Sequence, residues 1–381
     1  MRILYCIPHL YNSGGMERVL TQKVNWLAAH TSHEITILTT EPAPEGEKKI
    51  WFPLDERVKA IILPVNFNAD YNKPLPAKWW SHMDRMWLYK ACLADYIRAH
   101  KIELCISLGG KEIAFLHKLP CRTIAEMHFA MDQRRQLIEA NHKSLFWSLL
   151  GRIRTRQLVR AVKPLERLVV LTEADKEAWE KAGCRNVTVI PNPCALDGMK
   201  ITQLPRHKTV LAVGRLHEQK GFDLLLEAWQ PIEKHYPEYT LRIVGEGPKR
   251  AELEAQIENL HLQHVTLAGR AADMAKEYAA ASLFVLSSRY EGLPLALIEA
   301  MWSGTPCVAF DCPQGPAELL ADGRGWLVEN GNVEKLTQQI IDTLAHPDEA
   351  AARATKAQAF AQATYSEAAI MPQWEKVMNN E

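Results

Sequence analysis

The chain has 381 residues, more than one hydrophobic core usually organises, so its length predicts two domains. Lysine and arginine number 45, aspartate and glutamate also 45, and this balance gives no overall field that would attract nucleic acid. No stretch supplies the ~20 apolar residues of a membrane span. The eight cysteines show no Cys-x-x-Cys pair and no zinc-type spacing, which favours reduced, mostly buried thiols in a cytoplasmic protein.

The first half of the chain alternates short apolar runs with helical patterns. The opening run, Arg2–Pro8, is too short for a signal peptide and has no small-residue cleavage site, so it predicts a first strand. Such alternation is typical of parallel sheets covered by helices. The further strands predicted here are Glu34–Thr39, Val58–Val65, Glu103–Leu108, Thr123–Met127, Leu168–Leu171 and Val187–Ile190.

Prolines and a glycine interrupt the pattern between residues 191 and 208, which predicts an interdomain linker. A second series of strands follows: Thr209–Val213, Thr240–Val244, His264–Leu267, Leu283–Ser287, Pro306–Phe310 and Gly325–Val328. Helices are predicted at Asp223–His235 and Arg250–Asn259 and in the alanine-rich run Ala345–Ala363. We therefore expect an α/β protein of two doubly wound domains, 1–195 and 209–364, joined by a linker, 196–208. The carboxyl ends of both sheets would face a cleft, where ligands of such sheets bind.

The strongest chemical signal is the segment SSRYEGLPLALIEA, residues 287–300. A strand ends at its start, and Pro294 suits the first turn of a helix. The backbone N–H groups of Gly292, Leu293 and Leu295 would then form an anion site at a helix N-terminus. Glu291 and Glu299 would repel a diphosphate, so they more plausibly face neutral hydroxyl groups. The alternative is that Glu291 only favours the helix dipole and Glu299 lies on a solvated face.

A second element, VGRLHEQKG at residues 213–221, follows the first strand of the second domain and precedes a helix. Arg215 and Lys220 are therefore expected at the carboxyl edge of the sheet, beside the helix at Pro294. Two fixed cations can neutralise a diphosphate and stabilise it as a leaving group without a metal ion. The chain has no Asp-x-Asp triplet, which agrees with a metal-free site that needs no cofactor.

These residues resemble glycosyltransferase family 4, whose signature is a Glu-x7-Glu motif, here Glu291 to Glu299, with an upstream Arg-x4-Lys pair. The segments Gly245-Glu246-Gly247 and Ala268-Gly269-Arg270 also resemble that family. The resemblance covers essentially the whole chain and implies the GT-B fold, a retaining reaction on a nucleotide-sugar donor, and no essential metal. It also implies that a C-terminal helix, within 365–381, crosses back to the first domain.

The resemblance also implies a role for each matching residue. It places Arg215 and Lys220 on the donor phosphates, Glu291 and the Gly292-Leu293 backbone on the transferred sugar, and Glu299 on the ribose. Arg270 and Gly269 correspond to positions that hold the base, and Gly245 and Glu246 are weaker candidates for the same pocket.

In the first domain, Gly14 and Gly15 open a helix after the first strand, and the family places such a loop near the donor phosphate and sugar. An ordinary strand–helix turn is the alternative, with Glu17 only charging the helix start.

His128 follows the strand Thr123–Met127, and the family favours it over His9 as the histidine near the reacting sugar. The expected catalytic residues are thus His128, Glu291, Arg215 and Lys220.

Two further features bear on donor and acceptor. The segment CPQGPAE, residues 312–318, resembles bacterial family members that build surface glycans from UDP-sugars. Arg152, Arg156 and Arg160 fall on one face of a predicted helix, with Trp147, Leu150, Leu158 and Ala161 opposite. This cationic stripe could bind an acceptor diphosphate or an anionic membrane surface, with Trp79, Trp80 and Trp87 as an added anchor. A solvated basic face and ordinary core packing of the tryptophans are the alternatives.

The function expected is transfer of a hexose or N-acetylhexosamine from a nucleotide-sugar to a glycan or polyprenyl-diphosphate-linked acceptor, at or near the inner face of the membrane. A nucleotide-sugar hydrolase or epimerase on the same fold, or a non-catalytic sugar-nucleotide-binding protein, remains an alternative. A dinucleotide oxidoreductase is disfavoured, because neither first strand is followed by Gly-x-Gly-x-x-Gly.

Overall fold

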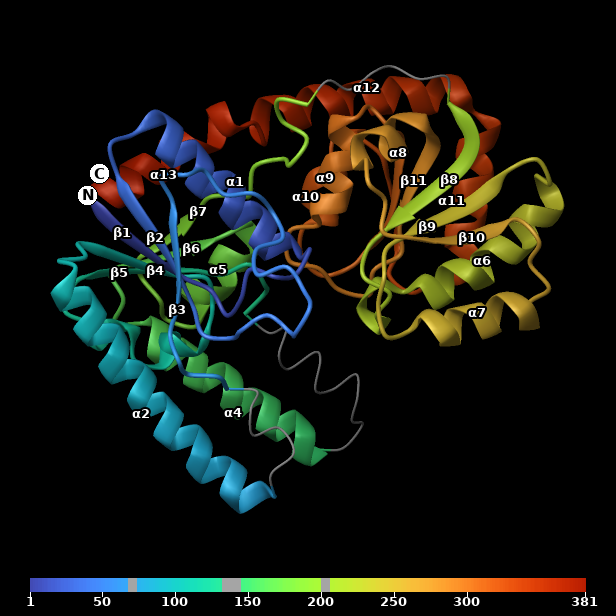
Figure 1. The fold of residues 1–381 in the computed structure, drawn as a ribbon. Helices are drawn as coiled ribbons and strands as arrows, with labels where there is room; N and C mark the ends of the chain where they lie inside the picture. Colours follow the sequence, from blue (N-terminus) through green and yellow to red (C-terminus); the bar gives the residue numbers. More distant parts are fainter. Residues whose placement is uncertain (68–73, 132–144, 200–205) are drawn as a thin grey trace. The chain divides into compact units, whose positions relative to one another are not determined.

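The computed structural model describes residues 1–67, 74–131, 145–199 and 206–381, and the chain folds into two compact units. The first unit contains Met1–Pro191 together with the C-terminal Met371–Glu381, and the second contains Asn192–Ile370. The C-terminal helix α13, Glu367–Asn379, therefore ends within the first unit, where the two chain termini lie close together (Figure 1). No helix in these ranges is both long enough and apolar enough to cross a membrane.

The first unit is built on a parallel sheet with the strand order β3-β2-β1-β4-β5-β6-β7. Its strands are β1 (Arg2–Cys6), β2 (Glu34–Thr39), β3 (Lys59–Ile62), β4 (Leu104–Ser107), β5 (Arg122–Glu126), β6 (Arg167–Val170) and β7 (Val187–Val189). The helices between them are α1 (Gly15–His30), α2 (Leu75–Ala99), η1 (Lys111–Ala114), η2 (Leu116–Lys118), α4 (Leu145–Val162) and α5 (Glu173–Lys181).

The second unit has a parallel sheet with the order β10-β9-β8-β11-β12-β13. Its strands are β8 (His207–Val213), β9 (Thr240–Val244), β10 (Val265–Gly269), β11 (Ala281–Leu286), β12 (Cys307–Asp311) and β13 (Trp326–Glu329). Its helices are η3 (Glu218–Lys220), α6 (Phe222–His235), α7 (Arg250–Asn259), α8 (Met274–Ala280), α9 (Leu295–Trp302), α10 (Pro316–Leu320), α11 (Val333–Ala345) and α12 (Pro347–Thr364).

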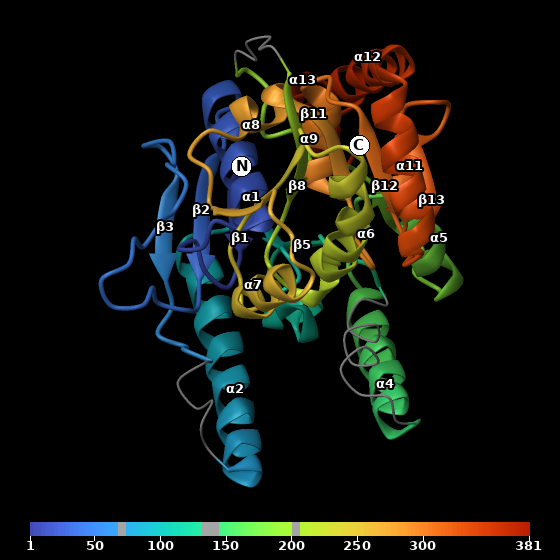
Figure 2. The same ribbon diagram turned by 90° about the vertical axis from the view of Figure 1, so that its right-hand side faces the viewer.

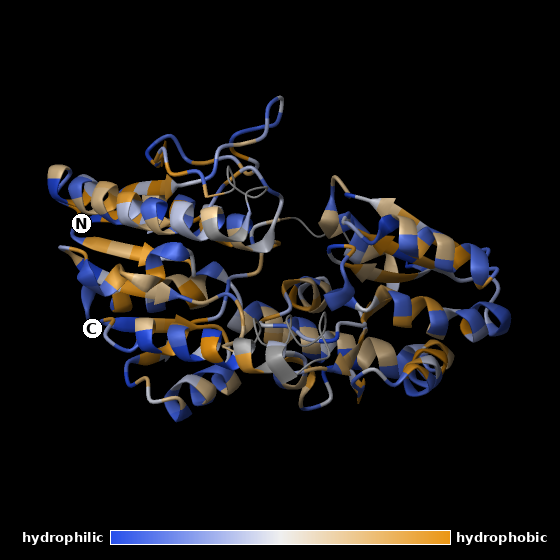
Figure 3. Ribbon diagram, turned by 90° about the horizontal axis from the view of Figure 1, so that it is seen from below, coloured by the Kyte–Doolittle hydropathy of each residue, from blue (hydrophilic) through white to orange (hydrophobic). Residues whose placement is uncertain are grey.

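The strands are the most hydrophobic parts of both units, because helices cover both faces of each sheet. Figure 3 shows this as orange strands beside helices of mixed colour. The two Rossmann-like domains predicted from the sequence are confirmed, and each predicted strand is present with its ends shifted by at most a few residues. The predicted start of the alanine-rich helix, Ala345, is wrong by two residues. α11 ends at Ala345, and α12 begins at Pro347, a residue that suits a first helical turn.

The strand order fixes where ligands are expected in each unit. In such sheets the chain winds in opposite directions from two neighbouring central strands, and the loops after those strands flank a crevice. These strands are β1 and β4 in the first unit and β8 and β11 in the second. The loops after β8 and β11 carry Arg215, Lys220 and Glu291.

Candidate active site

Lys220 and Glu291 contact each other where the loops after β8 and β11 meet. The ammonium Nζ of Lys220 lies 2.6 Å from Oε1 of Glu291, and the Ser288 hydroxyl donates to the same oxygen at 2.5 Å. Glu291 is buried, whereas its other oxygen, Oε2, has no partner among the residues that the structure describes. One oxygen therefore fixes the carboxylate, and the second is available to a ligand.

Backbone contacts hold these two loops together. The Arg289 amide donates to the Gln219 carbonyl at 2.8 Å, and the Gln219 side chain donates to the Tyr290 carbonyl at 3.0 Å. The Ser287 hydroxyl donates to the Lys220 carbonyl at 2.9 Å. Gln219 and Ser288 were not predicted as site residues. Each of the two stands close to a predicted site residue in the sequence. Nothing in the spacing of these residues shows, however, that the two loops contact each other.

Gly221 is needed where the loops cross. Its φ of +60° is a left-handed conformation, and a Cβ atom there would lie 2.1 Å from the Ser287 carbonyl oxygen. Arg289 adds a charged contact on the same side, because its guanidinium spans both carboxylate oxygens of Asp223 at 2.8 and 2.6 Å. The position of Glu291 is therefore set by the fold before any ligand binds.

Helix α9 begins beside Glu291, with Pro294 as its N-cap. The amides of its first residues are not used by the helix's own hydrogen bonds, and Gly292 and Leu293 directly precede the helix. The turn ending at Gly315 packs closely here: a Cβ on that residue would lie 2.8 Å from the Gly292 carbonyl oxygen. Gly315, which lies in the segment 312–318 noted in the sequence, thus shapes the approach to this helix N-terminus.

Glu299 lies within α9, one helical turn after Leu295. Only 6% of the residue is exposed. The interpretation that Glu299 lies on a solvated face is therefore wrong. Buried carboxylates are retained where polar groups face them, so this residue stays a candidate for a ligand hydroxyl.

Loops after three neighbouring strands also converge in the second unit. The Gly245 amide donates to the Gly269 carbonyl at 2.8 Å, and a Cβ on Gly245 would lie 1.9 Å from the Gly214 carbonyl oxygen. Arg215 and Arg270 directly follow two of these glycines and are both exposed. Arg215 forms no hydrogen bond or ion pair with the described residues, in contrast to Lys220. The structure thus groups Gly245 and Gly269 near Arg215.

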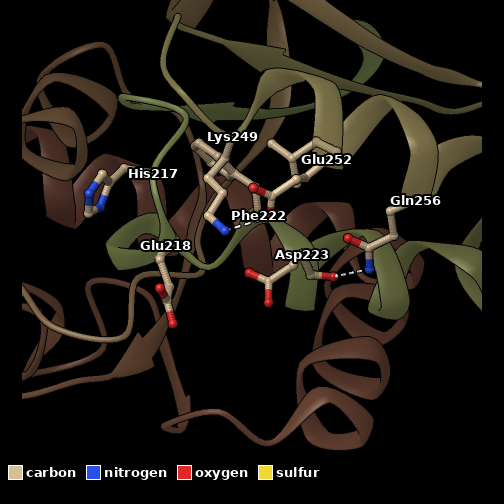
Figure 4. Close-up of a pocket in the computed structure, with 8 residues that line it drawn as sticks. His217, Glu218, Phe222, Asp223, Lys249, Glu252 and Gln256 are labelled. Carbon is tan, nitrogen blue, oxygen red and sulfur yellow. Dashed lines mark hydrogen bonds and ion pairs between the residues drawn. The ribbon is translucent and has the colours of Figure 1, made fainter. Parts of the chain in front are cut away.

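A pocket of about 280 Å³ lies next to this region and does not contain it. It is lined by His217, Glu218, Phe222, Asp223, Lys249, Glu252, Leu253 and Gln256 (Figure 4). None of the predicted site residues is among them. The lining carries three carboxylates and one ammonium group, and Arg289 pairs with only one of the carboxylates, that of Asp223. The remaining excess of negative charge disfavours a diphosphate. We therefore place the candidate site at Lys220 and Glu291 and not in this pocket.

In the first unit, Gly14 is the N-cap of α1 and Gly15 its first residue. A Cβ on Gly14 would lie 2.3 Å from a carboxylate oxygen of Glu17, so the glycine makes room for that side chain. Glu17 is buried and lies 3.0 Å from Nδ1 of His9. His9 and Glu17 therefore partner each other at the end of β1.

His128 lies two residues after β5, and its side chain is only 4% exposed. Its Nε2 atom is 3.1 Å from Oε1 of Glu126, an ion-pair distance, although the two groups are not aligned as a hydrogen bond. Oε2 of Glu126 bonds to the buried ammonium of Lys23. Burial opposes ionisation of Glu126, but the charges of Lys23 and His128 outweigh burial and lower the pKa of Glu126 to about 2.

Arg152, Arg156 and Arg160 lie on an exposed face of α4, as predicted from their spacing. Leu158, predicted opposite, is buried, whereas the side chain of Leu150 lies outside the described residues. The exposed face differs from the prediction in one respect, because Leu149 and Ile153 share it with the arginines at helical spacing.

Helix α2 carries three strongly exposed tryptophans: Trp79 (57%), Trp80 (65%) and Trp87 (74%). The alternative interpretation, in which these tryptophans pack in the core, is therefore wrong. Both α2 and α4 extend past the edge of the first sheet in two views (Figures 1 and 2). The two helices together present arginines, tryptophans and aliphatic side chains to the surroundings.

Comparison with known proteins identifies the family. Residues 13–197 match the family model Glycosyltransferase Family 4, and residues 207–346 match Glycosyl transferases group 1. The amylovoran biosynthesis glycosyltransferase AmsD of Erwinia amylovora is 34% identical over 99% of both chains. An alpha-1,4-N-acetyl-D-galactosaminyltransferase of Campylobacter jejuni, named for a PP-undecaprenol-linked glycan, is 26% identical over 86% of this chain and 84% of its own.

A solved structure of S. aureus TarM with UDP and alpha-GlcNAc-glycerol is 18% identical, covers 99% of both chains and has a TM-score of 0.76, which supports the fold. The family matches cover both compact units, and the relative from Erwinia extends over almost the entire chain. The chain belongs to glycosyltransferase family 4, has the GT-B fold of two Rossmann-like domains, and is a glycosyltransferase.

Proposed function

We propose that this glycosyltransferase moves a hexose or N-acetylhexosamine from a UDP-sugar to a glycan or lipid-linked acceptor in polysaccharide biosynthesis. The observation that carries the proposal is the cluster of Lys220, Ser288 and Glu291 beside the N-terminus of α9. It combines a fixed cation, the first amides of the helix and a carboxylate with one available oxygen. A sugar attached to a diphosphate offers the matching groups, namely negative oxygens and neutral hydroxyls.

The second unit supplies the donor contacts in this proposal. Arg215 and Lys220 bind the diphosphate and stabilise the charge that develops as its bond to the sugar breaks. Oε2 of Glu291 accepts a hydrogen bond from the transferred sugar, and Glu299 accepts one from the ribose. Gly245 and Gly269, with Arg270, take the nucleoside, since the loops that carry them converge beside Arg215.

Lys220 has two partners in this scheme. Without donor, its charge is balanced by Glu291. When a diphosphate binds, the ammonium, a point charge with three donors, can serve the carboxylate and a phosphate oxygen together. Arg215 has no such partner among the described residues, so its positive charge is not balanced there and is available to the donor.

Gly14, Gly15 and His128 of the first unit complete the proposal. The glycine loop serves the donor phosphate, and His128 bonds to the sugar. The acceptor hydroxyl attacks the anomeric carbon on the face that the diphosphate leaves, and its proton passes to the leaving phosphate oxygen. The bond from carbon to phosphate oxygen breaks as the bond to the acceptor oxygen forms, so the anomeric configuration is retained. We propose that no metal ion takes part, because the two cations and the α9 amides balance the charge.

The exposed faces of α2 and α4 suggest where the acceptor is met. Arginines among aliphatic and aromatic side chains suit a surface of anionic headgroups, because guanidinium groups contact phosphates while apolar groups enter the interface. We propose that these faces bring the enzyme to the inner membrane surface, where a polyprenyl-diphosphate-linked acceptor would be available. The name of the Campylobacter relative supports such an acceptor.

A donor panel tests the central proposal without knowledge of the acceptor. Slow nucleotide release is measured with UDP-, GDP- and ADP-sugars, and UDP-sugars are expected to be consumed fastest. Release from a GDP- or ADP-sugar alone would overturn the UDP assignment. Formation of a glycoside with added acceptor separates a transferase from a hydrolase or epimerase.

A further inference from the structure

A buried chain of charged groups extends from the C-terminal helix to His128 within the first unit. It begins at Lys23 on α1, a lysine with no exposed surface. The ammonium of Lys23 lies 3.7 Å from the ring centroid of Trp374 on α13 and bonds to Oε2 of Glu126. Trp374 is itself 1% exposed, so the C-terminal helix covers this lysine from water.

Glu126 uses its two oxygens in different directions. Oε2 contacts Lys23, and Oε1 lies 3.1 Å from Nε2 of His128. Glu126 ends β5, the strand that also presents His128 at the carboxyl edge of the sheet. One end of the carboxylate is therefore anchored to α1, and the other end contacts the imidazole.

Stability alone does not account for this arrangement. Burying a lysine and a glutamate removes both charges from water, and well-packed apolar side chains of similar volume would stabilise a fold at least as well. The pair does place a rigid negative group beside one particular imidazole. Within the same unit, the buried carboxylate of Glu112 is instead satisfied by Ser107 and Tyr89, at 2.5 and 3.1 Å.

We infer that Glu126 is a positioning residue that holds the imidazole of His128 for sugar transfer, and that Lys23 under Trp374 keeps Glu126 in place. The inference rests on the proposed function, because positioning of His128 affects the reaction only if His128 contacts the transferred sugar. Glu126 itself does not touch the substrate in this account. It acts by limiting the orientations of the histidine ring.

The test uses a double variant, Lys23→Met with Glu126→Gln, which keeps the buried volume and removes the lysine and glutamate charges together. Glu112→Gln is the matched control, because it neutralises another buried carboxylate of the same unit. Two properties are measured: the side-chain nitrogen NMR signal of His128, identified by its loss in His128→Ala, and kcat and KM for nucleotide release.

The double variant should shift the His128 signal and lower kcat roughly tenfold to a hundredfold, as expected for a misplaced catalytic group, with little change in donor KM. Glu112→Gln should leave the signal in place. In a His128→Ala background, the double substitution should have little further effect on kcat, because both changes act through one group.

An unshifted His128 signal in the double variant, or an equal loss of kcat in the His128→Ala background, would overturn the inference. The NMR measurement does not depend on turnover. Failure of the proposed function would instead appear as a wild-type enzyme that releases no nucleotide from any donor.

Discussion

Lys220 and Glu291 are 71 residues apart in the chain, yet the ammonium of one lies 2.6 Å from the carboxylate of the other. The contact joins the loops after β8 and β11, the two strands that flank the switch point of the second sheet. Arg215, on the same loop as Lys220, has no such partner among the described residues. The two cations therefore differ in what their removal should do.

We predict that Arg215→Ala and Lys220→Ala each lower kcat for nucleotide release by on the order of 10²–10³, as for the loss of a donor to transition-state charge. Lys220→Ala should also destabilise the protein by roughly 1–3 kcal/mol, because it leaves the buried Glu291 without its cation. Arg215→Ala should leave stability unchanged, since that side chain is exposed. Kinetics and chemical denaturation of both variants check this, and equal stability losses would contradict it.

Activity should persist in excess EDTA, because Arg215, Lys220 and the first amides of α9 can balance the donor diphosphate. The measurement is the rate of nucleotide release before and after chelation, with Mg²⁺ or Mn²⁺ added back as the control. Loss of activity on chelation that either metal restores would show that the site needs a metal ion.

The Lys23–Glu126 pair predicts a specific acid sensitivity. The pKa of Glu126 is lowered to about 2 from an ordinary value of 4.5, so its stabilising effect is complete above pH 4.5. That effect is lost as the pH falls towards 2, and it amounts to on the order of 3 kcal/mol. Unfolding free energies between pH 6 and pH 2 should therefore fall more steeply for wild type than for the Lys23→Met, Glu126→Gln double variant. Parallel curves would exclude a native carboxylate held ionised by Lys23.

The exposed faces of α2 and α4 should bind anionic membranes. Sedimentation with anionic liposomes is expected to fall markedly for an Arg152, Arg156, Arg160→Ser variant, and neutral liposomes should bind weakly in every case. Replacing the tryptophans at 79, 80 and 87 by serine should weaken binding further. The control is Lys234, Lys276, Lys356→Ser, which removes three exposed cations of the second unit. Equal binding by the arginine variant and wild type would leave the stripe as an ordinary solvated surface.

The sequence was sufficient to predict the strands of both sheets. Strands covered on both faces have continuous apolar runs in the sequence, such as Leu283–Ser287. Glycine and proline residues separate these runs from the helices. The loop motifs around Lys220 and Glu291 were also readable, because each stands directly after a predicted strand.

Pairings between distant segments were not readable in this way. Lys23 stands between polar and apolar residues of α1, and nothing local shows that it is buried against Glu126, 103 residues later. Ser288 was missed for a similar reason. Its hydroxyl donates to Glu291 because of the way the loop turns, which the neighbouring residues in the sequence do not show. The exposure of Trp87 could not be predicted either, since aromatic residues at helical spacing are more often core residues.

The most direct test of the account is the initial rate of UDP release from UDP-sugars by wild type, Glu291→Ala and Glu252→Ala. Glu291 belongs to the proposed site, and Glu252 lines the neighbouring pocket of about 280 Å³. We predict that Glu291→Ala lowers the rate by about a hundredfold or more, whereas Glu252→Ala stays close to wild type. A wild-type rate for Glu291→Ala, or a large loss for Glu252→Ala alone, would contradict the account and move the site to the pocket.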